Sequence, residues 1–552
     1  MKNKKMMLLL LPLCSVLAFT CTSCNKESNS RFEEYYDEDW KPGQNALKDA
    51  KQPTIKNPKG KTSILNEIRR SQNKIGLPSM GDANLLVVPI NFSGDDQVQE
   101  LNPNLDLVFT DDDVNALNDL YFAKSAPFGA PASVREYYTK SSYGKLNLNG
   151  VVSPVVTLPK TFTDYLFQSA VSTSFKDVYL EMVDYIYNYL FVETKTYYIG
   201  DFDADNDKKV DGISIICNYP YSLTFGEDTL DSIIQVFLGP GNVGFSNDIL
   251  DTNKTPVNSF SFISEEFSDI LFAGSDSNIY INQVGRMLGL DDYSDLTGDS
   301  VTGSVRAPLG LLDMMDGYIG DHNPFSKYQL GWTTPKTIKA EDIPNEGLTI
   351  KLRSSATYGD SLVLYTGKHN MFSEYLILDF YTPTGLNEIN SKSPYLFGNQ
   401  LFETSGIRVY QVDSRLVRGY GNTNYSIYDK TPDFDEKVTL PNGKKVYYTY
   451  DYAYTNNYEN EYANYGITQN TPLVSFLSKV GLNRHITDYS YGLIDDDIFA
   501  ENDEFGADSQ IDGFYKNFKF HGDGNNGARL NIKFKVSSVN EDEATIVLWR
   551  AE

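Results

Sequence analysis

One apolar, β-branched run, Asn84–Phe92 (NLLVVPINF), constrains the fold most, because it predicts a buried strand early in the chain. A capping box, Ser133-Val-Arg-Glu136, predicts a helix that continues through Lys140. A second, longer helix is predicted where apolar residues keep helical spacing, at Phe175, Val178, Met182, Ile186 and Leu190. Another strand is predicted over Ile213–Asn218. This mixture of helices and strands predicts the α+β class.

The second half of the chain favours strands. Beyond a charged connector flanked by Pro335 and Pro344, short alternating segments with turn signals continue to Glu552. The last two predicted strands are Leu530–Val536 and Ala544–Trp549. We expect a mixed domain over residues 61–335, then β-rich regions over 336–425 and 426–552. For this C-terminal part we predict a sandwich architecture.

The N-terminus predicts export and lipidation. Lys2, Lys4 and Lys5 precede an apolar run too short for a stable membrane span, which fits a signal peptide over residues 1–23. Thr22-Ser23-Cys24 resembles the lipobox of bacterial lipoproteins, with Cys24 as the lipidated residue. Cys21 and an ordinary secretory signal are the alternatives. Residues 24–60 are polar and aperiodic, which predicts a flexible tether. Lys26-Glu27 resembles sorting signals of some Gram-negative lipoproteins, so we expect an outer-membrane lipoprotein exposed at the cell surface.

The net charge and the cysteine content limit which classes of partner we expect for this protein. Removing residues 1–23 takes away three lysines and no acid, so the formal charge changes from −26 to −29 over 529 residues. This acidic balance argues against nucleic acid as a partner and suits an exported protein that holds calcium. Cys217 is then the cysteine left for the folded part, where it is predicted to be a buried core thiol. We expect the lipid on Cys24 to anchor the protein to the membrane.

The segment Ser277–Leu290 predicts a helix with an altered polar pattern. Ile281, Val284 and Leu288 form an apolar stripe, and Gly289 can turn the chain at the helix end. The helix resembles the active-site helix of zinc peptidases, whose H-E-x-x-H pattern places two histidines on one face around a metal. Asn282, Gln283 and Arg286 occupy those three positions. Amides are poor zinc ligands, and Arg places a cation where the metal should lie. Arg286 either blocks that cavity or reaches a carboxylate such as Asp292, and we expect the latter because an unpaired Arg beside a buried helix is costly.

Several segments, in order, are similar to the immune inhibitor A-like family of secreted zinc metallopeptidases. Over residues 80–420, the similar segments are Asn84–Phe92, Ser133–Leu146, Asp201–Gly212, Asn282–Ser294, Leu311–Gly317, Ser326–Trp332, Glu374–Asp379 and Gly406–Asp413. This resemblance implies a zincin-like domain over residues 61–335.

The resemblance also implies roles for single positions. Asn282 and Arg286 stand for the zinc histidines, and Gln283 stands for the general-base Glu. Asp292 occupies the third-ligand position and Met315 the Met-turn methionine, both as remnants of a metal site. None of the four histidines lies in the helix. We therefore expect no zinc and no catalytic residues, which makes the protein a catalytically inactive peptidase relative.

The loop Asp201–Gly212 predicts a calcium site. Asp203, Asp205, Asp207 and Asp211 recur at alternate positions, and Lys209 would contribute its backbone carbonyl oxygen. Lys208 replaces the usual glycine at position six, and no Glu follows at position twelve. Four clustered carboxylates repel one another without a cation. The alternative is a solvated acidic turn.

Three functions follow as hypotheses. The leading one is a surface lipoprotein that binds a peptide or protein ligand without cutting it. The second is an active hydrolase with a non-standard carboxylate or metal site among Asp291, Asp292, Asp295, Asp313 and Asp316. The third is a glycan-binding protein that uses exposed tyrosines, for which the Tyr- and Asn-rich segment Asp451–Asn470 is either a binding loop or an ordinary exposed loop.

Overall fold

A computed structural model describes a large part of the chain. It describes residues 76–94, 106–125, 132–171, 175–219, 256–265, 277–294, 307–316, 320–366, 369, 371, 373–392, 400–414, 457, 472–480, 492–506 and 532–550, together with the strand backbones at 54–57, 60–63, 416–420, 424–428, 437–439, 445–447 and 450–452.

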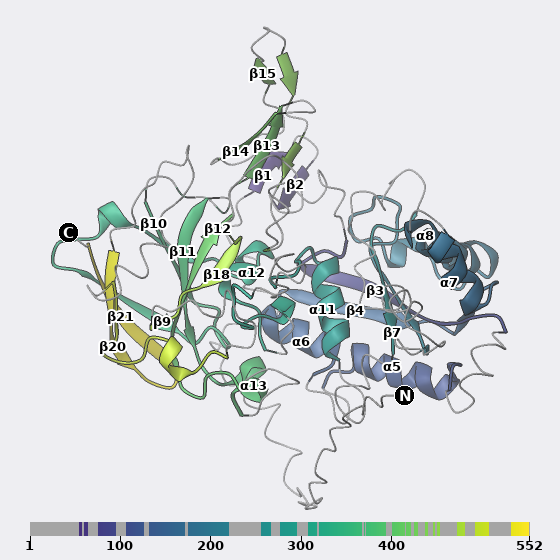
Figure 1. Ribbon diagram of the computed structural model, residues 1–552, viewed down its shortest axis with the longest axis horizontal. Coiled ribbons are helices and arrows are strands. Elements are labelled where there is room, and N and C mark those ends of the chain that lie inside the picture. Colours follow the sequence, from purple (N-terminus) through teal and green to yellow (C-terminus); the bar gives the residue numbers. More distant parts are fainter. Residues whose placement is uncertain are drawn as a thin grey trace, which may run out of the picture. The chain divides into compact units, whose positions relative to one another are not determined.

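A parallel sheet forms the centre of the first half (Figure 1). Its described strands follow the order β4-β3-β6-β7, and β5 also pairs with β3. Every pair among them is parallel. The bounds are Gly81–Asn91 for β3, Leu146–Val152 for β4, Val156–Thr157 for β5, Ile213–Cys217 for β6 and Phe260–Ser264 for β7. The strands predicted at Asn84–Phe92 and Ile213–Asn218 are thus confirmed, with ends shifted by a few residues.

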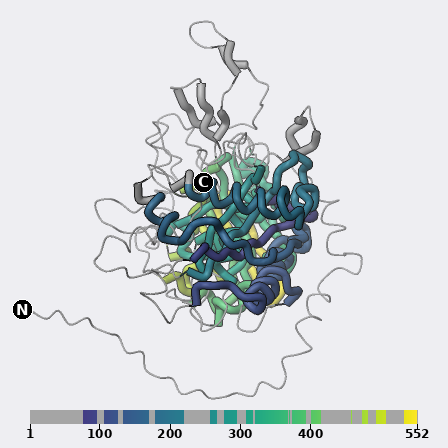
Figure 2. Tube along the Cα trace, turned by 90° about the vertical axis from the view of Figure 1, so that its right-hand side faces the viewer, coloured from purple at the N-terminus to yellow at the C-terminus, as the bar shows by residue number. Residues whose placement is uncertain are grey.

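Helices cover both faces of this sheet (Figure 1, Figure 2). Leu85 and Val87 of β3 face a core shared with α5, α6 and α11, whereas Leu86 and Val88 face a core shared with α7 and α8. Successive residues of a strand point to opposite faces, so a strand covered on both sides needs an uninterrupted apolar run. The helix bounds are Asp111–Phe122 (α5), Val134–Ser141 (α6), Phe162–Val171 (α7), Phe175–Tyr187 (α8) and Asn278–Met287 (α11).

The predicted helices occur, with one difference at α6. Ser133 caps α6 by accepting a hydrogen bond from the Glu136 backbone N–H at 3.0 Å, as the capping box requires. The Glu136 carboxylate instead contacts the Lys140 ammonium at 2.7 Å. The long helix α8 continues into a π-helical turn, Asn188–Glu193, and the predicted Val178, Met182, Ile186 and Leu190 are all buried.

Two of the described sheets pack together in the second half. One has the order β18-β12-β11-β10-β8 and the other β19-β20-β21-β9. Aliphatic and aromatic residues from both sheets share one core, which gives a sandwich. The bounds are Lys336–Lys339 (β8), Leu348–Arg353 (β9), Ser361–Tyr365 (β10), Glu374–Tyr381 (β11), Gly406–Asp413 (β12), Val474–Phe476 (β18), Glu504–Phe505 (β19), Ile532–Val539 (β20) and Glu543–Arg550 (β21).

The regions expected at 336–425 and 426–552 share this sandwich. Strand β9 pairs with β21, so chain segments almost 200 residues apart lie in one sheet (Thr349 opposite Val547). The second face of the other sheet is also covered, because Ile377 of β11 and Tyr410 of β12 belong to the core that contains Phe325 of α12 (Pro324–Gln329). This double burial explains why β10 to β12 are apolar on both faces.

The remaining described elements are short. They are β1 (Thr54–Asn57), β2 (Gly60–Ser63), α13 (Glu388–Lys392), β13 (Leu416–Tyr420), β14 (Asn424–Tyr428), β15 (Lys437–Thr439), β16 (Lys445–Tyr447) and β17 (Tyr450–Tyr452), with short 3-10 turns at Ile199–Asp201, Met314–Asp316, Ala340–Asp342, Gly385–Asn387 and Asp495–Asp497. Helices and sheets together confirm the α+β class.

Candidate functional site

The helix α11 is held in the core by its apolar stripe. Ile281, Val284 and Leu288 are at most 1% exposed. The Tyr138 hydroxyl donates to the Ile281 carbonyl oxygen at 2.6 Å, which fixes α11 against α6. Gly289 has φ +97°, a conformation that favours glycine, and it turns the chain directly after the helix. The stripe and the turn are therefore confirmed.

The polar positions of α11 form a compact network around Arg286. Its guanidinium contacts Asp292 through Nη2 and Asp291 through Nη1, the latter at 3.3 Å. Its Nε donates to Asn282 Oδ1 at 3.1 Å. The Arg286 side chain is only 8% exposed, and the two carboxylates are 18% and 14% exposed. The guanidinium therefore joins the helix to the segment that follows it.

This set of side chains does not fit a zinc ion. Structural and catalytic zinc sites use at least three nitrogen, sulfur or carboxylate ligands, and here a guanidinium lies among the side chains that would converge on the metal. Asn282 donates through Nδ2 to the Met314 carbonyl oxygen at 3.2 Å, and Gln283 donates to Asn282 Oδ1 at 3.3 Å. The expected pairing of Arg286 with Asp292 is confirmed.

Met315 lies directly against α11. A Cβ atom added to Gly285 would lie 2.6 Å from Met315 Sδ, so the two segments approach as closely as a glycine permits. The backbone N–H of Tyr293 donates to the Met315 carbonyl oxygen at 3.1 Å. Asp292 and Met315 thus both lie beside the helix positions that the sequence pattern singled out.

The nearby carboxylates Asp313 and Asp316 are buried. Asp313 accepts hydrogen bonds from the Asn323 backbone N–H at 2.6 Å and from Met315 N–H at 2.8 Å, and it contacts His322 Nδ1 at 3.1 Å. Asp316 accepts from the Ser294 hydroxyl and from Leu311 N–H. Burial, together with the charges of Asp313 and Asp292, raises the pKa of Asp316 to about 7, although the hydrogen bonds from Ser294 and Leu311 act in the opposite direction. These contacts make the pair internal acceptors for loop backbone. Asp295 lies outside the described residues.

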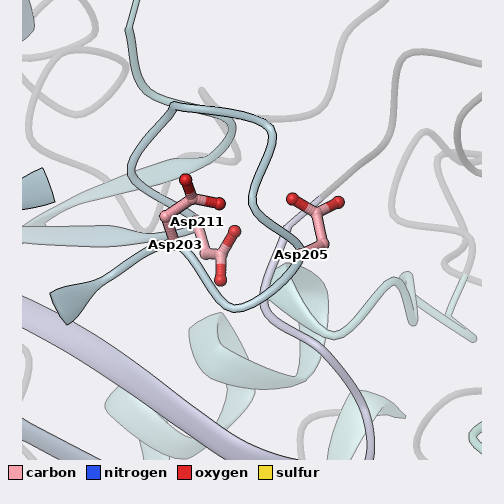
Figure 3. A group of neighbouring side chains, drawn as sticks. All are labelled: Asp203, Asp205 and Asp211. Atoms are coloured by element: carbon pink, nitrogen blue, oxygen red, sulfur yellow. The ribbon is translucent and has the colours of Figure 1, made fainter. Parts of the chain in front are cut away.

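The acidic loop brings three carboxylates together. Oxygen atoms of Asp203, Asp205 and Asp211 all lie within 4.8 Å of one another (Figure 3). Asp207 is not in this group, and its oxygens accept hydrogen bonds from Lys209 N–H at 2.9 Å and from the Asn258 side chain at 3.0 Å. Lys208, at the position of the usual glycine, has φ +72°, so the loop makes the expected turn there with a lysine.

The loop is anchored to the parallel sheet. Val210 is fully buried, and its N–H donates to the Pro256 carbonyl oxygen at 2.9 Å, just before β7. The Ser259 hydroxyl donates to the Asp211 carbonyl oxygen at 2.6 Å. Burial raises the pKa of Asp211 to about 7, and the charges of Asp205, Asp203 and Asp207 act in the same direction. Three oxygen ligands beside fixed backbone fit a hard cation such as Ca²⁺.

The structure tests the prediction for Cys217 but not the predictions for the N-terminus. Cys217 is buried in β6, and burial raises the pKa of its thiol to about 12, so it is a core thiol as predicted. Cys24, the tether and most of Asp451–Asn470 lie outside the described residues. Within the described part of the chain, no helix combines the length and apolar character needed to cross a bilayer.

Several buried charges were not anticipated. Arg408 of β12 donates two hydrogen bonds to the Asp379 carboxylate of β11. Lys327 of α12 contacts Asp321 at 2.5 Å. All four side chains are at most 5% exposed. The Arg408–Asp379 partners are 29 positions apart, on neighbouring strands, so no local pattern in the sequence could have paired them.

No protein-family model matches this sequence, and no curated protein shows significant similarity to it. The resemblance to the immune inhibitor A-like family therefore stays a prediction from the sequence.

Proposed function

We propose that the protein is a cell-surface lipoprotein whose zincin-like part binds a peptide or protein ligand without hydrolysing it. One observation carries the absence of hydrolysis in this proposal: Arg286 pairs with Asp291 and Asp292 at the helix positions where a zinc peptidase needs its ligands. A guanidinium bound by two carboxylates replaces the cross-link that a metal would supply. The fold around α11 can then be stable without a bound metal and without hydrolytic activity.

The arrangement around α11 supports the zincin-like part of the proposal. The helix follows β7, the last strand of the parallel sheet in chain order, and its Gly285 packs against Met315. Asp292 reaches back to the helix through Arg286. The resemblance implies that Asp292 and Met315 lie beside the helix positions of the zinc ligands, and these contacts support that implication.

Calcium would stabilise this scaffold. Asp203, Asp205 and Asp211 would hold the ion, and its role would be to neutralise the carboxylates and fix the loop between Phe202 and β6. No step of any reaction depends on it. The proposed lipid on Cys24 would anchor the chain to the outer membrane, leaving the folded part free to meet a ligand.

Metal analysis tests the inactive site. The chain lacking its first 24 residues is exposed to zinc and calcium, freed of loose ions, and analysed by mass spectrometry. We expect close to one calcium and no stoichiometric zinc per chain. One retained zinc per chain, with cleavage of a peptide library, would overturn the proposal.

Ligand binding needs a second experiment. The same protein is applied to arrays of extended peptides and of glycans. Selective binding of peptides without cleavage products supports the proposal. Selective glycan binding with no peptide signal would instead favour a carbohydrate-binding protein, and the metal result would be unaffected.

A further inference from the structure

A cavity of about 380 Å³ lies away from α11, where the first half of the chain meets the sandwich. Its walls come from Lys145 just before β4, from the link between α12 and β8, from β9, and from the turn Tyr358–Ser361 that leads into β10. This volume is within the range of sites that hold small molecules, roughly 300–1,000 Å³.

The walls are fixed by specific contacts. Gly359 has φ +69°, and an added Cβ there would lie 2.7 Å from the Tyr143 ring, so the turn is pressed against the α6–β4 connection. The next residue, Asp360, accepts three hydrogen bonds from Arg353, each at 3.0 Å. The backbone of the walls is therefore fixed before a ligand arrives.

Two buried hydroxyls in the wall have unused hydrogen-bonding capacity. Thr333 is 7% exposed and Ser361 is 5% exposed. Among the described residues, neither Thr333 Oγ1 nor Ser361 Oγ has a hydrogen-bond partner. Both oxygens are closed off from solvent, so a ligand reaches them only after the side chains of Thr333 and Ser361 rotate toward the cavity. A buried hydroxyl without a partner costs about 1–3 kcal/mol, so a ligand that bonds to the rotated hydroxyl regains stability.

The same walls are positively charged in a chain whose formal charge is −26. Lys145, Lys336 and Lys351 line the cavity, against one carboxylate, Asp360, which Arg353 already neutralises. Lys351 is itself paired with Glu543 at 2.7 Å. The Lys145 ammonium is buried, and the Trp332 carbonyl oxygen accepts one hydrogen bond from it at 2.5 Å. An ammonium has three N–H donors, which leaves donors for a ligand.

Burial lowers the pKa of Lys145 to about 8. An anion beside this lysine would favour its charged form. The positive walls and the unused hydroxyls together describe one kind of ligand, which carries an acidic group and several hydroxyls.

We propose that this cavity binds a small hydroxylated carboxylate, such as a uronic acid, whose carboxylate contacts Lys145 and Lys336 and whose hydroxyls bond to Thr333 and Ser361. This site is separate from α11 and does not depend on whether the peptidase-like part is inactive. A uronic acid can be free or can end an acidic polysaccharide. Both share the recognised chemistry.

Calorimetry on the full chain in detergent tests the proposal. Glucuronate is compared with glucose, which lacks the carboxylate, and with inorganic phosphate, which lacks the sugar hydroxyls. We expect glucuronate to bind at least about tenfold more tightly than either. An oligogalacturonate that binds more tightly than galacturonate identifies a polysaccharide end as the source, and equal affinities identify the free sugar.

Two variants probe the walls. Lys336 is exposed, so Lys336→Glu leaves folding intact, and we expect it to weaken glucuronate binding by about tenfold. Thr333→Val keeps the shape and removes the unpartnered hydroxyl. This substitution should weaken glucuronate binding by about fivefold. It should also raise the melting temperature of the ligand-free protein, whereas removal of a hydroxyl that is hydrogen-bonded within the fold would lower it.

Lys124→Glu, an exposed charge reversal after α5, is the matched control and should change nothing. The proposal is overturned if glucuronate gives no saturable binding, if glucose or phosphate binds as tightly, or if neither wall variant changes the affinity.

Discussion

Arg286 is the residue on which the polar network around α11 depends most. Its guanidinium is nearly buried and contacts the carboxylates of Asp291 and Asp292. Breaking a buried pair costs more than the pair contributes, because the remaining charges lose their partner. Arg also presents several N–H groups in a plane, so it can serve Asn282 and both carboxylates at once, which a lysine cannot do.

Substitution of Arg286 should therefore destabilise the fold. We expect Arg286→Met to lower the free energy of unfolding by about 2–3 kcal/mol and Arg286→Lys by less, since the lysine keeps the charge. Chemical denaturation measures both. The control is Lys392→Met, which breaks a pair in which both side chains are about half exposed or more, and it should cost at most about 0.5 kcal/mol. Equal effects of the Met substitutions would contradict the structural role of Arg286.

Asp316 gives a pH-dependent prediction. The pKa of this buried carboxyl is raised to about 7 from its usual value near 4. Folding therefore favours the protonated form, and the resulting stability is full below about pH 4 and is lost as pH rises through 7. Asp316→Asn should raise the melting temperature at pH 8 and leave it nearly unchanged at pH 4.

Asp313→Asn is the matched comparison for Asp316→Asn. Asp313 is surrounded by donors, including two from Asn323, so an amide N–H₂ there meets N–H groups. We expect destabilisation at both pH values. A gain in stability at pH 8 for both variants would show that repulsion, and not the donor arrangement, controls this loop.

Packing between elements explains the glycine of α11. Gly285 lets the helix approach Met315, and an alanine would place Cβ 2.6 Å from Met315 Sδ. We expect Gly285→Ala to cost about 2 kcal/mol by overpacking, despite the higher helix propensity of alanine. In a Met315→Ala background the same change should cost much less. Additive effects in this double-mutant cycle would mean that the two residues are not in contact.

The acidic loop gives a second prediction at the scale of elements. Calcium at 100 times its dissociation constant should raise the free energy of unfolding by about 2.7 kcal/mol, because it binds only the folded loop. Asp205→Asn should abolish this gain, as measured by thermal unfolding with calcium or EGTA. Asp119→Asn, an exposed aspartate on α5, is the control. An unchanged gain in the Asp205 variant would favour the solvated-turn alternative.

Local patterns in the sequence predicted the elements well, because periodicity and capping act over a few residues. The α11 stripe, the Gly289 turn and the strand β3 all lie where the pattern placed them. The pairing of Arg286 with Asp292 followed from one argument, that a buried guanidinium needs a partner. Pairing between distant segments did not follow, since β9 and β21 are joined only by the fold. For the same reason the cavity beside Lys145 left no local pattern.

At the scale of the whole molecule, the proposed zincin-like scaffold predicts that zinc ligands can be built into α11. Asn282, Arg286 and Asp292 already converge, because Arg286 contacts both of the others. In the triple variant Asn282→His, Gln283→Glu and Arg286→His, two histidines four positions apart would share a helix face with the Asp292 carboxylate nearby, which are the three ligands that zinc requires. We expect about one zinc per chain by mass spectrometry, and none in the starting protein.

Replacing Asp292 with Asn in the triple variant should weaken zinc binding at least about tenfold. A variant with Arg286→Leu in place of Arg286→His has a single histidine and should bind no zinc. If the triple variant folds, as judged by an unchanged circular dichroism spectrum, but binds no zinc, then the region around α11 is not a peptidase scaffold. Arg286 and its carboxylates would then be an independent structural pair.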